Sequence, residues 1–221
     1  MTVAARAGDE GGKFAGCGEK TFAGNSDAPV DLHTCGGLHG IGMGLHTWGG
    51  GGGASWQSVI FGQEEAKFPH PGNPFAIGLG MCVPTVMTSG NQADKERFVR
   101  PAVLGEEIWC QGFSEPDAGS DLAACRTRAE RKGDVYVVNG QKVWSSFAHI
   151  ADFCILVTQS DPDGPRYRNL TYLIVDMHAP GVEVRPLRQI TGEAEFNEIF
   201  FTDVEVPVAN RLDEEGNGWA V

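Results

Sequence analysis

The chain has 221 residues, of which 41% are hydrophobic and 21% charged, so it has enough apolar side chains for a core and is not a disordered segment. Its formal net charge of −12 argues against partners such as nucleic acid or an anionic membrane surface, which are bound by clustered Lys and Arg. The sequence has no run of eighteen apolar residues and its first twelve residues lack a signal-peptide core, which predicts a cytoplasmic protein.

Residues 1–54 form an atypical segment that is rich in Gly, His and small residues and has no sustained period. Four side chains in it are potential metal ligands: His33, Cys35, His39 and His46. Their spacing matches no standard zinc pattern, so we predict an atypical leader and no metal site. The six cysteines of the chain include no C-x-x-C pair, which predicts free thiols. They are Cys17, Cys35, Cys82, Cys110, Cys125 and Cys154.

Residues 55–106 are predicted to form a partial helical domain. Ser55 can cap a first helix, which ends before Pro69 and Pro71. A second apolar stretch covers 75–87 and ends at the Ser-Gly-Asn of 89–91. A third begins near Gln92 and contains Pro101, which we expect to kink or divide it. Together these segments predict a small helical layer whose apolar faces need a partner.

Residues 107–212 are predicted to form a β domain. Two β-prone runs, 134–138 and 141–144, are joined by Asn139-Gly140, which predicts a hairpin because both turn positions favour positive φ. Further short strands are predicted at 153–158, 171–175, 181–184 and 199–206. The predicted fold class is therefore α+β, with a partial N-terminal helical layer followed by an antiparallel β-barrel or sandwich.

The run from Trp109 to Leu122 is the most informative segment. It is predicted to begin as a strand and to turn sharply at the Glu-Pro-Asp-Ala-Gly of 115–119. Ser114, Gly119 and Ser120 would then offer hydroxyl and backbone N–H groups in a tight curve, which suits a pyrophosphate or the polar edge of a planar ring. On spacing alone, a polar β-turn without a ligand explains the same residues equally well.

Three blocks in this order resemble the acyl-CoA dehydrogenase family. The first is Phe-Ser-Glu-Pro-Asp-Ala-Gly-Ser-Asp at 113–121, which is similar to the family signature. The second is Gly-Gln-Lys-Val-Trp-Ser-Ser at 140–146, followed by Ala-Asp at 151–152, and the third covers 191–198 and 206–211. The helical segments at 77–80, 94–98 and 105–107 also resemble the family, so the resemblance covers about residues 48–221.

The resemblance implies FAD as the cofactor and eight residues as its binding site: Gln111, Phe113, Ser114, Gly119, Ser120, Trp144, Ser145 and Ser146. It places Ser114 at the pyrimidine side of the flavin and Ser146 near N5. It places Ser120 near both the FAD phosphates and the thioester, so Ser120 is also a predicted substrate-binding residue. Without the resemblance, Trp144 is more simply interpreted as a core residue. The carboxylate of Glu115 is structural in the family, and His149 is predicted to lie on the surface.

The activity that the resemblance implies is α,β-desaturation of an acyl-CoA thioester, as in fatty acid metabolism, with hydride transfer to flavin N5. The implied partners are the acyl-CoA, an acceptor of the electron-transfer flavoprotein type and other copies of the chain. Family members continue into a C-terminal helical domain that supplies the catalytic base, and residues 213–221 are predicted to begin it, so the catalytic residue is unknown. We therefore expect a fragment that binds FAD weakly and has little activity alone. The alternatives are a non-catalytic flavin-binding or inert remnant and a related flavin oxidase.

Overall fold

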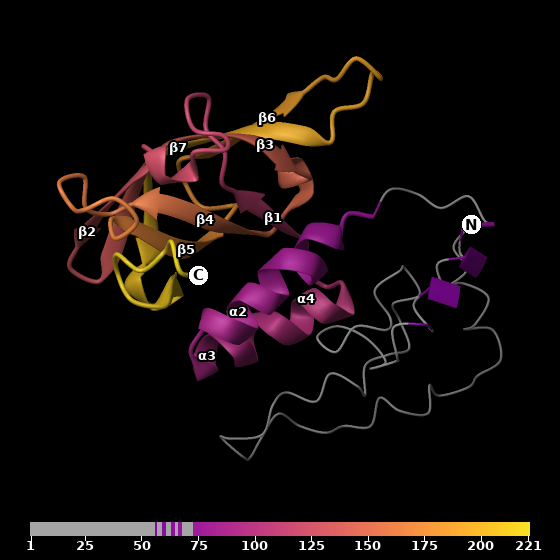
Figure 1. Ribbon diagram of the computed structural model, residues 1–221, viewed down its shortest axis with the longest axis horizontal. Helices are drawn as coiled ribbons and strands as arrows, with labels where there is room; N and C mark the ends of the chain where they lie inside the picture. The colour runs from indigo at the N-terminus through magenta and orange to yellow at the C-terminus, as the bar shows by residue number, and fades with distance from the viewer. Residues whose placement is uncertain (1–55, 57–58, 61–62, 65, 68–72) are drawn as a thin grey trace.

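The computed structural model describes residues 56, 59–60, 63–64, 66–67 and 73–221. Residues 73–221 form a helical layer beside a twisted sheet (Figure 1). The predicted leader at 1–54, its four potential metal ligands and the Ser55 cap lie outside the described residues. Of the first predicted helix, Trp56, Val59 and Ile60 are described and are helical. In the described part of the chain, no helix is long and apolar enough to cross a membrane.

The helical layer consists of two helical runs. The first joins the π-helix η3 (Gly78–Cys82) to α2 (Val83–Ser89). The second joins α3 (Gln92–Asp94), the π-helix η4 (Lys95–Val99) and α4 (Arg100–Leu104). It begins with a capping box, in which Asn91 and Asp94 each accept the backbone N–H of the other at 3.0 and 2.9 Å. Pro101 lies at the start of α4. The division of the helix that was predicted at this proline is a change from π to α geometry, because the proline has no N–H to donate.

The β domain is one open sheet of eight strands. The strands are β1 (Trp109–Gly112), β2 (Arg128–Lys132), β3 (Val135–Ser146), β4 (Phe153–Gln159), β5 (Leu170–Asp176), β6 (Val182–Leu187), β7 (Phe196–Pro207) and β8 (Arg211–Leu212). Three short 3-10 helices connect them: η5 (Leu122–Ala124), η6 (Ala148–Ile150) and η7 (Val208–Asn210). The order is β6-β7-β3-β2-β4-β5-β8, with β1 paired to β4, so the sheet is sandwich-like and not a closed barrel. The α+β class is confirmed, and the pairing is antiparallel except between β4 and both β1 and β2.

The hairpin predicted at Asn139-Gly140 is wrong. Strand β3 continues through both residues, and the turn before it lies at Gly133, which joins β2 to β3 at a φ of 63°. Gly140 instead allows Thr127 to lie close to the backbone of β3. A Cβ on Gly140 would lie 2.6 Å from Oγ1 and 2.7 Å from Cα of Thr127, and its φ is 154°. The Asn-Gly pair therefore marks an irregularity in the pairing of β3 with β7, where the register shifts between Val138 and Gly140.

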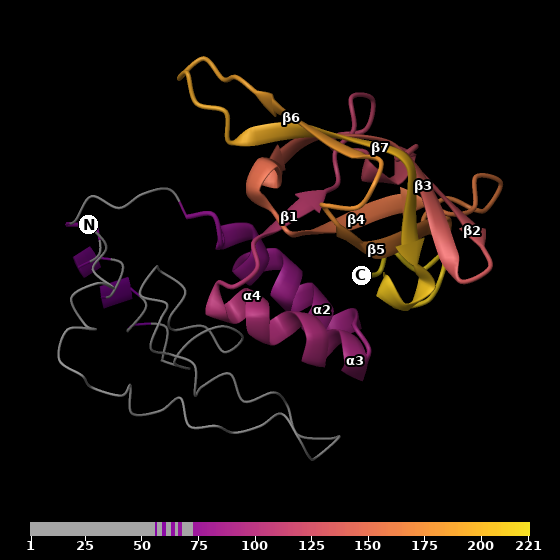
Figure 2. The same ribbon diagram turned by 180° about the vertical axis from the view of Figure 1, so that it is seen from behind.

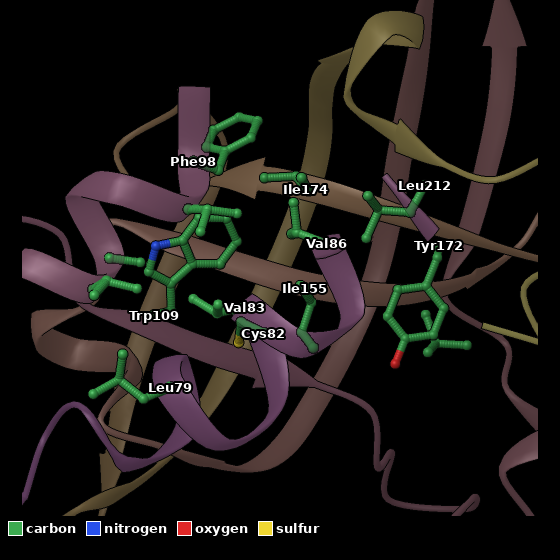
Figure 3. Packing of buried hydrophobic residues seen from close by; sticks show 14 of the residues in the cluster. Leu79, Cys82, Val83, Val86, Phe98, Trp109, Ile155, Tyr172, Ile174 and Leu212 are labelled. Carbon is green, nitrogen blue, oxygen red and sulfur yellow. The ribbon is translucent and has the colours of Figure 1, made fainter. Parts of the chain in front are cut away.

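The core lies on both faces of β4 and β5. On one face, Ile155 and Ile174 belong to a cluster that also contains Val83, Val86 and Phe98 of the helical layer (Figure 3). On the other face, Cys154 and Leu156 pack with Tyr136, Ile199 and other residues of β3 and β7. The views in Figures 1 and 2 agree that the helices cover one side of the sheet. Because both faces are buried, β4 is apolar along almost its whole length.

The cysteines of the described residues are free thiols. Cys82, Cys110, Cys125 and Cys154 are all buried and unpaired, as predicted. Cys17 and Cys35 lie outside the described residues.

Candidate functional site

The segment after β1 makes the predicted turn. Glu115 donates its backbone N–H to Ala118 O at 2.8 Å, and Ala118 donates its own to Glu115 O at 3.1 Å. Gly119 and Ser120 follow on the exposed side of this turn. A Cβ added to Gly119 would meet no atom within 4 Å, so the backbone there faces open space. The structure thus leaves this backbone open to a neighbouring molecule.

Glu115 anchors the turn to β3 through a buried ion pair. Its Oε1 lies 2.8 Å from Nζ of Lys142, a side chain with no exposed surface. Glu115 also accepts the backbone N–H groups of Arg126 at 2.7 Å and Thr127 at 2.9 Å. Burial alone would raise the pKa of Glu115, but Lys142 and the N–H donors outweigh it and lower that pKa to about 2. A carboxylate held in this way fits a structural role and is a poor proton acceptor.

Two further contacts complete this polar cluster. Lys142 Nζ donates to the carbonyl of Phe113 at 2.9 Å, directly before the turn. The Cys125 thiol donates to Glu115 Oε1 at 3.0 Å and lies 3.3 Å from Lys142 Nζ. Burial and the nearby Glu115 carboxylate together raise the pKa of the Cys125 thiol to about 11, although Lys142 opposes the shift. The thiol therefore stays neutral, and Lys142 is held by three partners: Phe113 and Glu115 in the turn segment, and Cys125 after it.

Strand β3 next brings Trp144 alongside Ser114. Val143 donates its backbone N–H to Ser114 O at 2.9 Å, which joins the turn segment to β3 immediately before Trp144. The pairing of β3 with β7 shifts register between Lys142 and Ser145, and Trp144 has a φ of 62°. The Trp144 side chain is 57% exposed, and its ring meets only the edge of Phe196 at 6.1 Å among the described rings. Trp144 is therefore a surface residue and not part of the core.

The serines differ in their surroundings. Ser145 is buried, and its Oγ has no hydrogen-bond partner in the described residues. The hydroxyl groups of Ser114, Ser120 and Ser146 likewise make no hydrogen bond to another described residue. Ser114 and Ser146 are half-buried, and Ser120 is exposed. The hydroxyl groups of Ser114, Ser120 and Ser146 are therefore accessible and unengaged within the described residues, whereas Ser145 Oγ is enclosed by protein.

The two remaining predicted site residues lie on and just after β1. Gln111 is half-buried, and its Oε1 is a buried acceptor without a partner. The ring of Phe113 packs edge-on against Tyr172 at 5.7 Å and belongs to the core beside the helical layer. Phe113 therefore contributes to a site only through its backbone carbonyl, which accepts a hydrogen bond from Lys142 Nζ. His149 is exposed in η6.

Comparison with known proteins matches this region to one family. The family described as "Acyl-CoA dehydrogenase, middle domain" matches residues 110–204. The acyl-CoA dehydrogenase IpdE1 of Mycobacterium tuberculosis is 40% identical over 173 residues, which are 78% of this chain and 45% of IpdE1. This chain carries an acyl-CoA dehydrogenase middle domain.

Solved structures agree with this assignment. The Tcur3481-Tcur3483 steroid ACAD is similar with a TM-score of 0.72 and 29% identity, over 86% of this chain and 48% of that one. The prolyl acyl carrier protein oxidase AnaB is similar with a TM-score of 0.62 and 32% identity, over 66% of this chain and 39% of that one. This chain, with its acyl-CoA dehydrogenase middle domain, covers less than half the length of each of these relatives.

Within this middle domain, the structure joins Ser114 to the segment that contains Trp144, Ser145 and Ser146. Gly119 and Ser120 lie just beyond the anchored turn, and no hydrogen bond links them to Trp144 in the described residues. Sequence reasoning missed Lys142, Cys125 and also Asn197, a buried residue opposite Ser145. A signal existed for Lys142, because it shares the inward face of β3 with Tyr136 and Val138. A lysine on that face requires a buried acidic partner.

Proposed function

We propose that this chain forms the FAD-facing part of an acyl-CoA dehydrogenase. The observation that supports this most strongly is Trp144, an exposed aromatic residue held at positive φ beside Ser114. A tryptophan at positive φ costs about 1–3 kcal/mol, and the exposed ring recovers little of that by packing within the described residues. Such strain is commonly kept where the side chain contacts a ligand.

The residues present fit FAD. A flavin ring is planar and has polar edges, so it needs an aromatic wall and hydrogen-bond partners. Trp144 offers the wall, while Ser114 and Ser146 offer hydroxyl groups that have no hydrogen-bond partner among the described residues. Gln111 Oε1 and Ser145 Oγ are buried polar atoms without a partner in the described residues, and each such atom costs free energy. The open backbone at Gly119 provides room for the phosphates.

The chemistry that bound FAD supplies is acceptance of a hydride from the β-carbon of an acyl-CoA thioester. In this proposal, Trp144 covers the ring and excludes water, Ser114 and Ser146 orient its polar edge, and Ser120 contacts both the phosphates and the thioester. The buried pair of Glu115 and Lys142 fixes the distance between the turn and β3. Glu115 is not the base, because its carboxylate is buried, paired and of low pKa.

The same proposal covers the organisation of the chain and its partners. We assign residues 55–106 to a partial helical domain, 107–212 to the β domain and 213–221 to the start of a C-terminal helical domain that supplies the base. The proposed partners are an acyl-CoA, an acceptor of the electron-transfer flavoprotein type and other copies of this chain, in the cytoplasm. If residues 1–221 are expressed alone, we expect little or no turnover, because the proposal assigns the base to the C-terminal helical domain.

The test is a titration of the purified chain with FAD, followed by anaerobic addition of an acyl-CoA. We expect weak binding, seen as quenching of flavin fluorescence, and no bleaching of the flavin absorbance. Failure to bind FAD at millimolar concentration would favour an inert remnant of the family. Bleaching by acyl-CoA would contradict the assignment of the base to a separate domain.

A related flavin oxidase is the second candidate, and the similarity to AnaB favours it. The two functions differ in how the reduced flavin is reoxidised. Photoreduced FAD bound to this chain is expected to be reoxidised by air no faster than free reduced FAD if the chain is a dehydrogenase. A much faster reoxidation with stoichiometric hydrogen peroxide would favour the oxidase.

A further inference from the structure

Asn197 is a buried residue of β7 that binds two carbonyl groups. Its side chain has no exposed surface. Its Nδ2 donates to Ser145 O on β3 at 3.0 Å and to Glu195 O, before β7, also at 3.0 Å. Both hydrogens of the amide group are therefore used to fasten the end of β3 to the chain that enters β7.

These bonds lie next to the irregularity that contains Trp144. Lys142 is paired with Ile199 and Ser145 with Asn197, so β3 has two residues in this interval where β7 has only Glu198. This is a β-bulge, which reverses the direction of a side chain relative to the regular ladder. A further bond from Phe147 N to Glu195 O at 2.7 Å closes the strand end after the bulge. Asn197 thus fastens the first residue after Trp144.

The remaining contacts of Trp144 do not fix its direction. Its ring is more than half exposed and meets the edge of Phe196 at an interplanar angle of 83°. Asn197 itself is costly, because its Oδ1 is buried without a partner in the described residues. An unsatisfied buried acceptor costs about 1–3 kcal/mol, so an apolar side chain would fill this space more favourably. The amide therefore has a use other than filling space.

We propose that Asn197 is a positioning residue for the flavin site. By holding Ser145 and Glu195 together, it keeps the bulge closed and the Trp144 ring directed outward, where it can cover the cofactor. This inference rests on the proposed function, since the ring's orientation matters only if the site holds a flavin. Asn197 touches neither cofactor nor substrate in this account and acts only through Trp144.

A double-mutant cycle tests this inference on the full chain. Asn197→Ala is expected to weaken FAD binding about tenfold in the wild-type background. In the Trp144→Phe background, Asn197→Ala is expected to weaken FAD binding by less than about twofold, because the residue through which Asn197 acts is already altered. Equal losses in both backgrounds would overturn the proposal, since Asn197 would then act on the fold in general.

Asn139→Ala is the matched control. Asn139 exchanges two hydrogen bonds with Asp203 across the other irregularity of the same strand pair, at 3.0 and 2.9 Å. Its loss is expected to leave FAD affinity unchanged within about twofold. A tenfold loss in this control would also overturn the proposal. If Asn197→Ala does not fold cooperatively, Asn197→Ser, which keeps one donor, replaces it in the cycle.

A measurement without FAD separates this inference from the proposed function. The emission of Trp144 is obtained as the difference between each protein and its Trp144→Phe counterpart. Asn197→Ala is expected to change the acrylamide quenching of this emission, and Asn139→Ala is expected to leave it unchanged. A wild-type chain that fails to bind FAD would refute the proposed function, and unchanged quenching in Asn197→Ala would refute the positioning role.

Discussion

Two irregularities interrupt the pairing of β3 with β7, and the extra residue lies on β7 in the first and on β3 in the second. At the first, Gly140 packs against Thr127 so closely that a Cβ would lie less than 3 Å from three atoms. At the second, Trp144 adopts a φ of 62° and presents a ring that is more than half exposed. On β3, the residue with positive φ is a glycine at the first irregularity and a tryptophan at the second, and only the tryptophan is strained there.

This difference shows how a fold separates stability from function within one strand. Gly140 allows two parts of the β domain to approach, so its benefit is realised within the protein. Trp144 gains little from the described protein atoms, and in the proposed function its benefit comes from contact with the flavin. Lys142 lies between the two and fastens β3 to the turn at Glu115. Substitutions at and around these positions therefore test the comparison.

The largest effect is expected at Lys142. Replacement by Met removes the charge that faces buried Glu115, and an uncompensated buried charge costs about 3–5 kcal/mol. The free energy of unfolding from urea titration should fall by this amount. The double variant K142M/E115Q should be more stable than K142M, because the unpaired charge is gone. A loss below about 1 kcal/mol in K142M would contradict the anchoring role.

The same ion pair predicts a dependence of stability on pH. The pKa of Glu115 is lowered from 4.5 to about 2 in the folded chain, so the folded state prefers the ionised carboxylate. This stabilisation is fully present above pH 4.5 and is lost as the pH falls toward 2, by about 3 kcal/mol in total. The stability difference between wild type and Glu115→Gln should therefore shrink over this range. A difference that stays constant would show that the charge of Glu115 contributes nothing.

Gly140→Ala is expected to cost about 2–3 kcal/mol, because the new Cβ would overlap Thr127 at backbone and side chain. Gly133→Ala is the control, since Gly133 also has positive φ but would meet no atom within 4 Å. Backbone strain alone predicts about 1 kcal/mol there. Similar losses in both variants, measured by urea unfolding, would refute the close approach as the reason for Gly140.

The smallest effect on stability is expected at Gly119. Alanine there meets nothing within 4 Å, so the free energy of unfolding should change by less than about 0.5 kcal/mol. FAD affinity should nevertheless fall, because the added methyl group occupies the face offered to the phosphates. Gly80→Ala, in a helix where a Cβ also meets no atom within 4 Å, should leave FAD affinity unchanged. Unchanged affinity in Gly119→Ala would exclude this backbone from the site.

The sequence predicted most of the fold because its signals were local. The apolar runs of β4, β5 and β7 and the turn at 115–119 were each recognised from neighbouring residues and are present. The hairpin at Asn139-Gly140 failed because a glycine next to an asparagine also suits a bulge, and only Thr127, distant in the sequence, decides between them.

The candidate site was predictable only as a set of residues. The family signature placed Ser114 and Trp144 in one site, and the bond from Val143 N to Ser114 O joins their segments. Their support was not predictable, because Lys142, Cys125 and Asn197 each bind a partner that lies at least ten residues away in the sequence: Glu115, Glu115 and Ser145. The positive φ of Trp144 had no local signal either, since nothing in Val-Trp-Ser-Ser indicates a bulge.

Trp144→Gly tests the central claim most directly, with stability and FAD affinity measured on the same sample. Glycine relieves the strain at a φ of 62°, which offsets the lost contact with Phe196. We expect a free energy of unfolding within about 1 kcal/mol of wild type and an FAD affinity at least about tenfold lower. A variant that loses several kcal/mol of stability while binding FAD as well as wild type would contradict it, because Trp144 would then serve the fold and not the cofactor.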